Sequence, residues 1–471
     1  MRLLAISRLG PLGLLLFALL LSNVSAAATR VWVANNGVDS PSCGAASNPC
    51  RSISQGIENA QSGDTIYVGP GHYGNVSGSA DYSGPGDERP QTFVNDSEGC
   101  LVCITKSLHI YSVSGASVTV IAGSPPPQGS GISMANVAIL QDGVAFGSAG
   151  HGFTLTGGSS VGLEIDYQTM EDVSSVGPSR NISVSGNVDI GDGSGFVFSG
   201  RTETTQECPT SSPVCAPTAQ LLFSDNESYG NGGFSYSATA NMDLGPGQVL
   251  FENNLAMGSG GGFQIQTGFQ CKTCEVAIRA SNIQWRNNVA TNSGIGFYAN
   301  MPGEISGNTA AYNSQAGFQV TPGPPSLFQH NSAIGNSGPG VIIQWSPDAF
   351  TEFGGSFQTF SQNNFFGNDR NRPTLALHTG DGGGGHGPYN PGPSAHCGVL
   401  NVGALADIIG GPAGTPPPRA PLAANYDYWG SAAGPKATGA GDAIGGACDQ
   451  NNAVTTARFP AATAYPVTTA P

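Results

Sequence analysis

Four acidic residues stand close enough together in this sequence to act on one substrate. Glu164 and Asp166 would share one face of a strand, and Asp189 and Asp192 fall in one predicted turn. Carboxylate oxygens are the ligands that Ca²⁺ prefers, and Ca²⁺ held against the acid group of a uronate lowers the cost of removing its α-proton. The four residues are therefore candidates for a catalytic cluster in a polysaccharide lyase or glycoside hydrolase, with Ca²⁺ as cofactor in the case of a lyase. The catalytic and metal-binding residues otherwise stay unknown, because the few basic residues are scattered over different parts of the chain.

A second set of residues suits carbohydrate binding without catalysis. Gln264, Gln266, Tyr298, Asn300 and Gln319 are predicted to face outward from neighbouring strands. Amide and hydroxyl groups hydrogen-bond to sugar hydroxyls, and an aromatic ring stacks on a sugar ring. The alternative interpretation is an ordinary solvated sheet face.

The elements that carry these residues are repeats of one short phrase. Gly followed by Phe, once by Val, and then by alternating apolar and polar residues occurs seven times, beginning at Gly152, Gly195, Gly233, Gly262, Gly296, Gly317 and Gly340. Such alternation predicts half-buried strands, and a repeat of this length predicts a solenoid in which each unit buries its apolar face on the next. The earlier repeats are longer than the later ones, so we expect loop insertions there.

Six of these phrases follow an Asn, and the Asn residues align the repeats: Asn187, Asn226, Asn254, Asn288, Asn308 and Asn331. The residue three positions before each Asn is large and apolar: Val184, Phe223, Phe251, Trp285, Ile305 and Phe328. We expect stacked Asn side chains to pass amide hydrogen bonds between coils at a spacing of about 4.8 Å, which makes them structural rather than catalytic. Glu252 and Arg286 stand in one outward column and are expected to pair across coils.

The two ends of the solenoid have their own signals. Ile53, Ile57 and Ala60 recur at helical spacing and predict an N-terminal capping helix that covers the first coil. Residues 63–73 then predict a turn into a strand. The last coil is expected to be covered by an aromatic residue: Tyr426, Tyr428 or Trp429.

The ten cysteines fall mostly into close pairs. We expect four local disulfides, which join Cys43 with Cys50, Cys100 with Cys103, Cys208 with Cys215, and Cys271 with Cys274. Cys397 and Cys448 are left over and are also expected to be oxidised. Zinc is the alternative for the two pairs with two intervening residues. The sequence alone does not settle the connectivity.

The first 26 residues have the basic start, short apolar stretch and small final residues of a secretory signal peptide. We therefore expect a secreted or extracellular protein, with the periplasm or cell surface as alternatives, and no membrane attachment after the signal is removed. The net charge is -15, which argues against nucleic acid as a partner. The oligomeric state is not indicated.

Residues 49–57 and 63–73, the Asn and Gly-Phe repeats, and residues 425–430 together resemble the secreted right-handed parallel β-helix proteins of the pectate-lyase-like superfamily. The resemblance implies an all-β fold, a single-stranded right-handed parallel β-helix solenoid built from parallel β-helix repeats. It implies no particular chemistry, because that superfamily includes lyases, hydrolases, epimerases, tailspikes and adhesins. The motif of its calcium-dependent lyases is not found, so no catalytic residue is carried over.

The chain thus divides into a signal peptide at 1–26, a cap with the first coils at 27–125, the repeats at 126–370, and a loop-rich closing coil with a tail at 371–471. Our first hypothesis is a secreted protein that binds extracellular polysaccharide. The alternatives are a lyase or hydrolase acting on a uronate-containing polymer, and a structural or adhesive surface protein. The sequence leaves open whether the chain is an enzyme.

Overall fold

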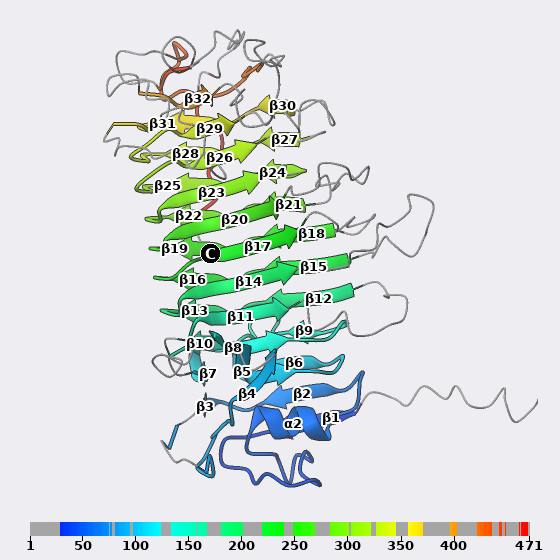
Figure 1. The fold of residues 1–471 in the computed structure, drawn as a ribbon. Helices are drawn as coiled ribbons and strands as arrows, with labels where there is room; N and C mark the ends of the chain where they lie inside the picture. The colour runs from blue at the N-terminus through cyan, green and yellow to red at the C-terminus, as the bar shows by residue number, and fades with distance from the viewer. Residues whose placement is uncertain are drawn as a thin grey trace, which may run out of the picture.

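The computed structural model describes residues 29–469 apart from 75, 78–80, 95–97, 124–132, 158, 167–179, 201–218, 240–247, 269–282, 301–302, 322–325, 345–356, 371–395, 403–421, 436–441, 445–447, 449–460 and 462. Within this part the chain winds into stacked coils whose strands form three long sheets (Figure 1). All strand pairs are parallel except β4 with β5. The predicted all-β solenoid, a parallel β-helix, is confirmed.

Each sheet takes one strand from each regular coil. The first sheet consists, in order, of β1 (Arg30–Val33), β2 (Thr65–Val68), β6 (His109–Ser112), β9 (Ala145–Phe146), β12 (Arg180–Ser185), β15 (Ala219–Ser224), β18 (Gln248–Glu252), β21 (Ile283–Arg286), β24 (Glu304–Ser306), β27 (Ser326–Gln329) and β30 (Phe357–Ser361). The second sheet consists of β3 (Gly71–Gly74), β7 (Thr119–Ala122), β10 (Thr154–Thr156), β13 (Val188–Ile190), β16 (Glu227–Tyr229), β19 (Leu255–Met257), β22 (Val289–Thr291), β25 (Thr309–Ala311), β28 (Ser332–Ile334) and β31 (Asn364–Phe366). The third sheet consists of β4 (Gln91–Val94), β5 (Glu98–Ile104), β8 (Ser133–Ile139), β11 (Val161–Asp166), β14 (Ser194–Gly200), β17 (Phe234–Thr239), β20 (Gly261–Gly268), β23 (Ile295–Asn300), β26 (Phe318–Thr321), β29 (Val341–Gln344) and β32 (Val399–Val402).

Aromatic rings stack along the inside of the third sheet. The Phe that follows Gly in five successive coils is almost fully buried, and the ring centroids of neighbours lie 4.8 to 4.9 Å apart: Phe196, Phe234, Phe263, Phe297 and Phe318. The apolar column that precedes each ladder Asn is also buried, as Phe223 and Phe251 show at 4.9 Å. Burial of each such ring contributes about 1.5–3 kcal/mol, so these columns hold the coils together.

The predicted Asn ladder is present and fully buried. The backbone N–H and Nδ2 of Asn226 both donate to Oδ1 of Asn254, at 3.0 and 3.1 Å. Asn254 donates to Asn288 in the same way and gives a further Nδ2 hydrogen bond to the carbonyl of Phe223 in the preceding coil, at 2.9 Å. The column continues in both directions, as Asn187, Asn226, Asn254, Asn288, Asn308, Asn331, Asn363 and finally Asp427.

A second buried polar column, which the repeats alone did not lead us to expect, lies five residues after the first in the regular coils and fifteen residues after it in the closing segment. Its members are Asp192, Asn231, Ser259, Ser293, Asn313, Asn336, Asn368 and Asp442. Asn313 donates through its backbone N–H and Nδ2 to Oδ1 of Asn336, at 3.0 and 2.9 Å, and Asn336 repeats this to Asn368. Both columns thus end on a buried aspartate of the closing segment, Asp427 or Asp442.

Each column stands directly after a residue with left-handed backbone conformation. Asp225 and Asn253, both with φ of 55°, precede the first column, and Gly230 and Gly258, with φ of 68° and 67°, precede the second. Gly, Asn and Asp adopt this conformation at the lowest cost. The two turns therefore fix a three-residue strand of the second sheet between them, such as β16 or β19.

A short helix, α2 (Ile53–Asn59), lies at the N-terminal end of the stack beside β1 and β2 (Figure 1). Ser52 caps it by accepting a hydrogen bond from the Gln55 N–H at 3.1 Å. Ile53 and Ile57 belong to the buried core. The predicted helix is confirmed, whereas its role as a lid over the whole first coil stays a prediction.

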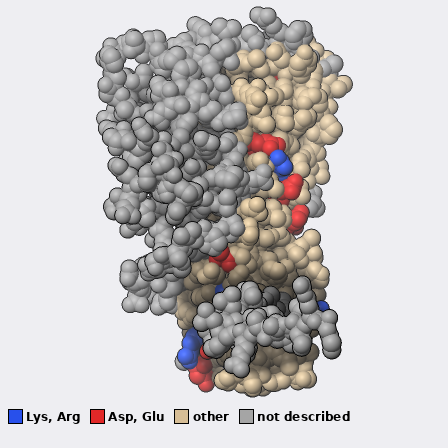
Figure 2. Space-filling model, turned by 90° about the vertical axis from the view of Figure 1, so that its right-hand side faces the viewer, with Lys and Arg blue, Asp and Glu red and all other residues tan. Residues whose placement is uncertain are grey.

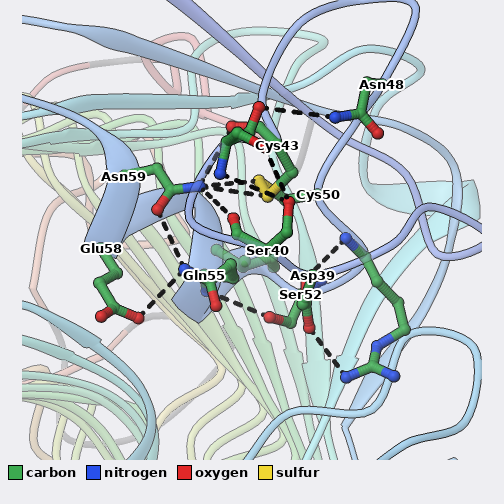
Figure 3. The surroundings of a disulfide bond; sticks show 12 residues. Asp39, Ser40, Cys43, Asn48, Cys50, Ser52, Gln55, Glu58 and Asn59 are labelled. Atoms are coloured by element: carbon green, nitrogen blue, oxygen red, sulfur yellow. Dashed lines mark hydrogen bonds and ion pairs between the residues drawn. A yellow bond between two sulfur atoms is a disulfide. The ribbon is translucent and has the colours of Figure 1, made fainter.

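The loop before this helix is fastened by a disulfide between Cys43 and Cys50 (Figure 3). Nδ2 of Asn59 donates to the carbonyls of Ser40 and Cys43, at 2.8 and 3.1 Å. At the other side of the loop, Asp39 forms an ion pair of 2.8 Å with Arg51. These single contacts hold the first coil, which has no Asn ladder among its described residues.

At the other end of the stack, Trp429 is fully buried and its ring lies 5.0 Å from that of Phe365. Tyr426 is 56% exposed. Of the three aromatic residues predicted to cover the last coil, Trp429 is therefore the one that packs into the core.

Candidate functional site

A groove of about 640 Å³ lies on the outer face of the first sheet. Its described lining comes from β6, β9, β12, β15 and β18, so it runs along the stack across adjacent coils. The outward side chains that line it are His109, Ala145, Asn181, Ser183, Gln220, Leu222 and Leu250.

The strand register explains this composition. Ser183, Leu222 and Leu250 occupy one outward column on neighbouring strands, and Asn181 and Gln220 occupy the next. Both leucines are half-buried, whereas the two amide side chains are exposed. An apolar floor is therefore flanked by hydrogen-bonding groups.

The groove suits an uncharged ligand. Amides and a hydroxyl can donate and accept hydrogen bonds, and the leucines offer an apolar surface. Only His109 among the described lining residues is titratable, and no carboxylate is among them. The lining supports binding but not a pair of catalytic carboxylates.

Two strands of this groove directly follow long segments of the sequence. Asn181 and Gln220 each stand second in their strands, directly after segments 167–179 and 201–218. Those segments, and 269–282 before β21, lie outside the described residues. The insertions predicted from the unequal repeats therefore fall between the third sheet and the first.

The polar residues predicted to bind sugar lie on a different face, the outside of the third sheet. Gln264, Tyr298 and Gln319 stand side by side on β20, β23 and β26. Tyr298 is half-buried, which raises its pKa, and Gln319 is only 5% exposed. The side chains of Gln266 and Asn300 lie outside the described residues.

Towards the C-terminus the same outward column becomes apolar and belongs to a separate buried cluster. The next outward residues, Ile342 and Leu400, are fully buried together with Ala316 and Ala443. Cys397 and Cys448, which are joined by a disulfide, belong to the same cluster. This face is therefore less open than the sequence led us to expect.

Of the four acidic candidates, the structure places one on the outside of the coils and two on the inside. Glu164 faces outward from β11, since its neighbour Leu163 is fully buried. The side chain of Asp166 lies outside the described residues. Asp189 and Asp192 lie in the interior, 0% and 2% exposed. An enzymatic role for these residues stays a prediction, and the burial of the second pair gives it no support.

Asp189 and Asp192 form a buried acid pair at the start of the second polar column. Asp192 accepts hydrogen bonds from the Ser159 N–H at 2.8 Å and from Nδ2 of Asn136 at 2.6 Å, and Asp189 accepts one from Asn231. Burial, followed by the hydrogen bond and charge of Asp192, raises the pKa of Asp189 to about 9. At neutral pH the pair therefore shares one proton.

Charged side chains are few on the described surface of the side shown in Figure 2, where several gather in a short line along the stack. Glu252, Arg286 and Glu304 project outward from adjacent strands of the first sheet. Nη2 of Arg286 lies 2.8 Å from Oε2 of Glu304. The expectation that Arg286 pairs with Glu252 is thus corrected: Glu304 is its ion-pair partner, and its hydrogen bond raises the pKa of Arg286.

Two predicted cysteine pairs are disulfides in the structure, Cys43–Cys50 and Cys100–Cys103, and the two left-over cysteines form a third disulfide, Cys397–Cys448. Because Cys100 and Cys103 are joined to each other, this pair is not a zinc site.

The other two predicted cysteine pairs are not tested by the structure. Cys208 and Cys215 lie in segment 201–218, which is outside the described residues. Cys271 and Cys274 lie in segment 269–282, which is also outside them. The disulfide between Cys208 and Cys215, and the disulfide or zinc site at Cys271 and Cys274, therefore stay predictions.

No group of three or more His, Cys, Asp or Glu side chains within the described residues is placed to hold a metal ion. No helix in that same part of the chain has the length and apolar character needed to cross a membrane.

No protein-family model, no curated protein and no solved structure matches this chain. The residues of the chain themselves show a parallel β-helix with a groove of uncharged side chains on its first sheet.

Proposed function

We propose that this chain is an exported parallel β-helix protein that binds an uncharged extracellular polysaccharide in the groove on its first sheet. The observation that carries the proposal is the lining of the groove, where exposed amides of Asn181 and Gln220 flank Leu222 and Leu250. Amides hydrogen-bond to sugar hydroxyls, and an apolar floor suits the C–H face of a sugar ring. The net charge of -15 disfavours an acidic polymer.

The shape of the groove favours a polymer over a single sugar. Five adjacent strands line it, and a strand spacing of about 4.8 Å gives it a length of about 19 Å. A chain of sugars that lies along the stack would cross one strand after another at the same regular distance.

Two features of the chain support export. The first 26 residues have the pattern of a secretory signal peptide, and the described cysteines are paired in disulfides. We further infer a distant relation to the pectate-lyase-like superfamily from residues 49–57, 63–73 and 425–430 and from the repeats. This relation supports the fold and assigns no catalytic residue.

The test is incubation of the mature, oxidised chain with a panel of neutral and acidic polysaccharides, with Ca²⁺ or with a chelator. Retention on each polymer is measured by affinity electrophoresis. Unsaturated uronide absorbance and new reducing ends are followed in the same samples. We expect retention on at least one neutral polymer, without product and without dependence on Ca²⁺.

Each other outcome points to another function. Ca²⁺-dependent unsaturated product would establish a lyase and direct mutation to Glu164 and Asp166. New reducing ends without unsaturated product would establish a hydrolase. Neither retention nor product on any polymer would contradict the proposal and favour a structural or adhesive role.

A further inference from the structure

The C-terminal segment turns back along the outside of the second sheet. The Ala461 N–H donates at 2.9 Å to a carbonyl of the closing coil. Tyr465 then lies beside Asn364 of β31, and Thr468 lies beside Thr309 of β25. Residues 461 and 463–469 therefore cross three successive coils of the stack in the direction of the N-terminus.

Asn364 holds the backbone of Tyr465 as a neighbouring strand would. Its Oδ1 accepts from the Tyr465 N–H at 2.9 Å, and its Nδ2 donates to the Tyr465 carbonyl at 3.1 Å. The phenol of Tyr465 donates to the carbonyl of Tyr426 at 2.6 Å. One residue of the tail is thus tied both to the last regular coil and to the closing coil.

A second clamp lies two strands further along. Oγ1 of Thr309 donates to the Thr468 carbonyl at 2.7 Å, and the Thr468 hydroxyl donates to the carbonyl of Gly307. Three residues of extended chain span about 10 Å, and two strand spacings are about 9.6 Å. The length of the extended tail between Tyr465 and Thr468 therefore matches the distance between the strands that bind these two residues.

The residues in the outward column of the second sheet are polar where the tail crosses it. Thr309, Ser332 and Asn364 stand in register on β25, β28 and β31, and all three are polar. The two members directly before them in the same column, Leu255 and Val289, are apolar, and the member before those is Glu227. Hydrogen-bonding side chains thus occur where an added backbone needs partners.

We propose that Thr309, Ser332 and Asn364 form a binding site for an extended peptide, and that its ligand is the chain's own segment 463–469. The bound segment straps the closing coil, which includes Tyr426, to the regular stack. Attachment to the same chain gives the segment a high effective concentration at its site. This inference is independent of polysaccharide binding.

The test compares backbone hydrogen exchange in the full mature chain and in a chain that ends at Pro460. Truncation is expected to speed exchange of the Asn364, Phe365 and Tyr428 amides at least tenfold, because these amides bond between coils that the strap joins. Amides of β13, β16 and β19 should not change. A synthetic peptide of residues 461–471 should restore protection in the truncated chain.

Two full-length variants guard against a general loss of folding in the truncated chain. Tyr465→Pro removes the N–H that Asn364 accepts, whereas Tyr465→Ala keeps it; both remove the phenol. Faster exchange in Tyr465→Pro than in Tyr465→Ala, confined to β25, β28, β31 and the closing coil, supports the strap. Unchanged exchange at Phe365 and Tyr428 after truncation, or equal exchange in the two variants, would overturn the proposal.

Discussion

The inside and the outside of the same coils differ in whether one residue type recurs from coil to coil. Inside, one residue type recurs from coil to coil, as in the ladder that joins Asn226, Asn254 and Asn288. Outside, the groove column on the same strands changes from serine to leucine, as Ser183 and Leu222 show. Recurrence thus marks the residues that hold the stack, because each ladder Asn donates to a side-chain oxygen in the next coil. Its absence marks the surface available for a ligand, so inner variants should alter stability and outer variants should alter binding.

The largest effect is expected from Asn254→Ala. The change removes the acceptor of two buried donors of Asn226 and leaves the Phe223 carbonyl without its amide donor. Each buried polar group left without a partner costs about 1–3 kcal/mol. We expect the free energy of unfolding to fall by about 3–5 kcal/mol, measured by urea denaturation.

Asn253→Gly is the matched control, because Asn253 is exposed and has a left-handed φ of 55° that Gly adopts freely. Its free energy of unfolding should stay within about 0.5 kcal/mol of the wild type. Equal losses in the two variants would contradict the ladder account.

The second effect concerns pH. The native state raises the pKa of Asp189 from 3.8 to about 9, so it binds this proton more tightly than the unfolded chain does. The stability of the fold should therefore fall as pH rises from 4 towards 9 and then level off. Asp189→Asn keeps this side chain neutral at every pH, and should remove this part of the decline.

The measurement is the urea midpoint at pH 5, 7 and 9 for the wild type, Asp189→Asn and the exposed control Asp225→Asn. Glu88 and Asp442, with pKa values raised by burial to about 7 and about 6, add a decline of the same sign in all three proteins. The wild type should lose at least about 1.4 kcal/mol more than Asp189→Asn between pH 5 and 9. Parallel pH curves for these two proteins would show that the acid pair shares no proton.

The smallest effect is expected on the third sheet. Gln264→Ala changes an outward amide that is not part of the groove, so retention on polysaccharide should stay within twofold of the wild type. The free energy of unfolding should change by less than about 0.5 kcal/mol. A loss of retention in Gln264→Ala would move the binding site to the polar column of the third sheet.

The interior was largely predictable because its signal is repeated. The positions of Asn226 and Asn254, and of the Phe after each Gly, follow from aligning the repeats. The second ladder was missed because Ser259 and Ser293 interrupt its run of Asn, although its spacing of five residues from the first ladder is visible in the sequence of the regular coils. Asp192 was therefore taken for a possible catalytic residue when it stands at a ladder position.

The groove was not predictable in the same way. Its floor depends on which outward residues become neighbours, as Leu222 and Leu250 do, and no repeat identifies them. The crossing of residues 463–469 over β25 and β31 was equally hidden, since the contact joins Thr309 with Thr468, far apart in the sequence. Long-range contacts made only once leave no pattern to read.

Binding in the groove is tested most directly by a double variant, Asn181→Ala with Gln220→Ala. The measurement is its affinity for the neutral polysaccharide that retains the wild type. Both side chains are exposed, so the variant should melt at the wild-type temperature. If the groove binds the polysaccharide, the double variant loses affinity at least tenfold while its fold stays unchanged. Wild-type affinity in this variant, together with a loss in Tyr298→Ala, would contradict binding in the groove and place the site on the third sheet.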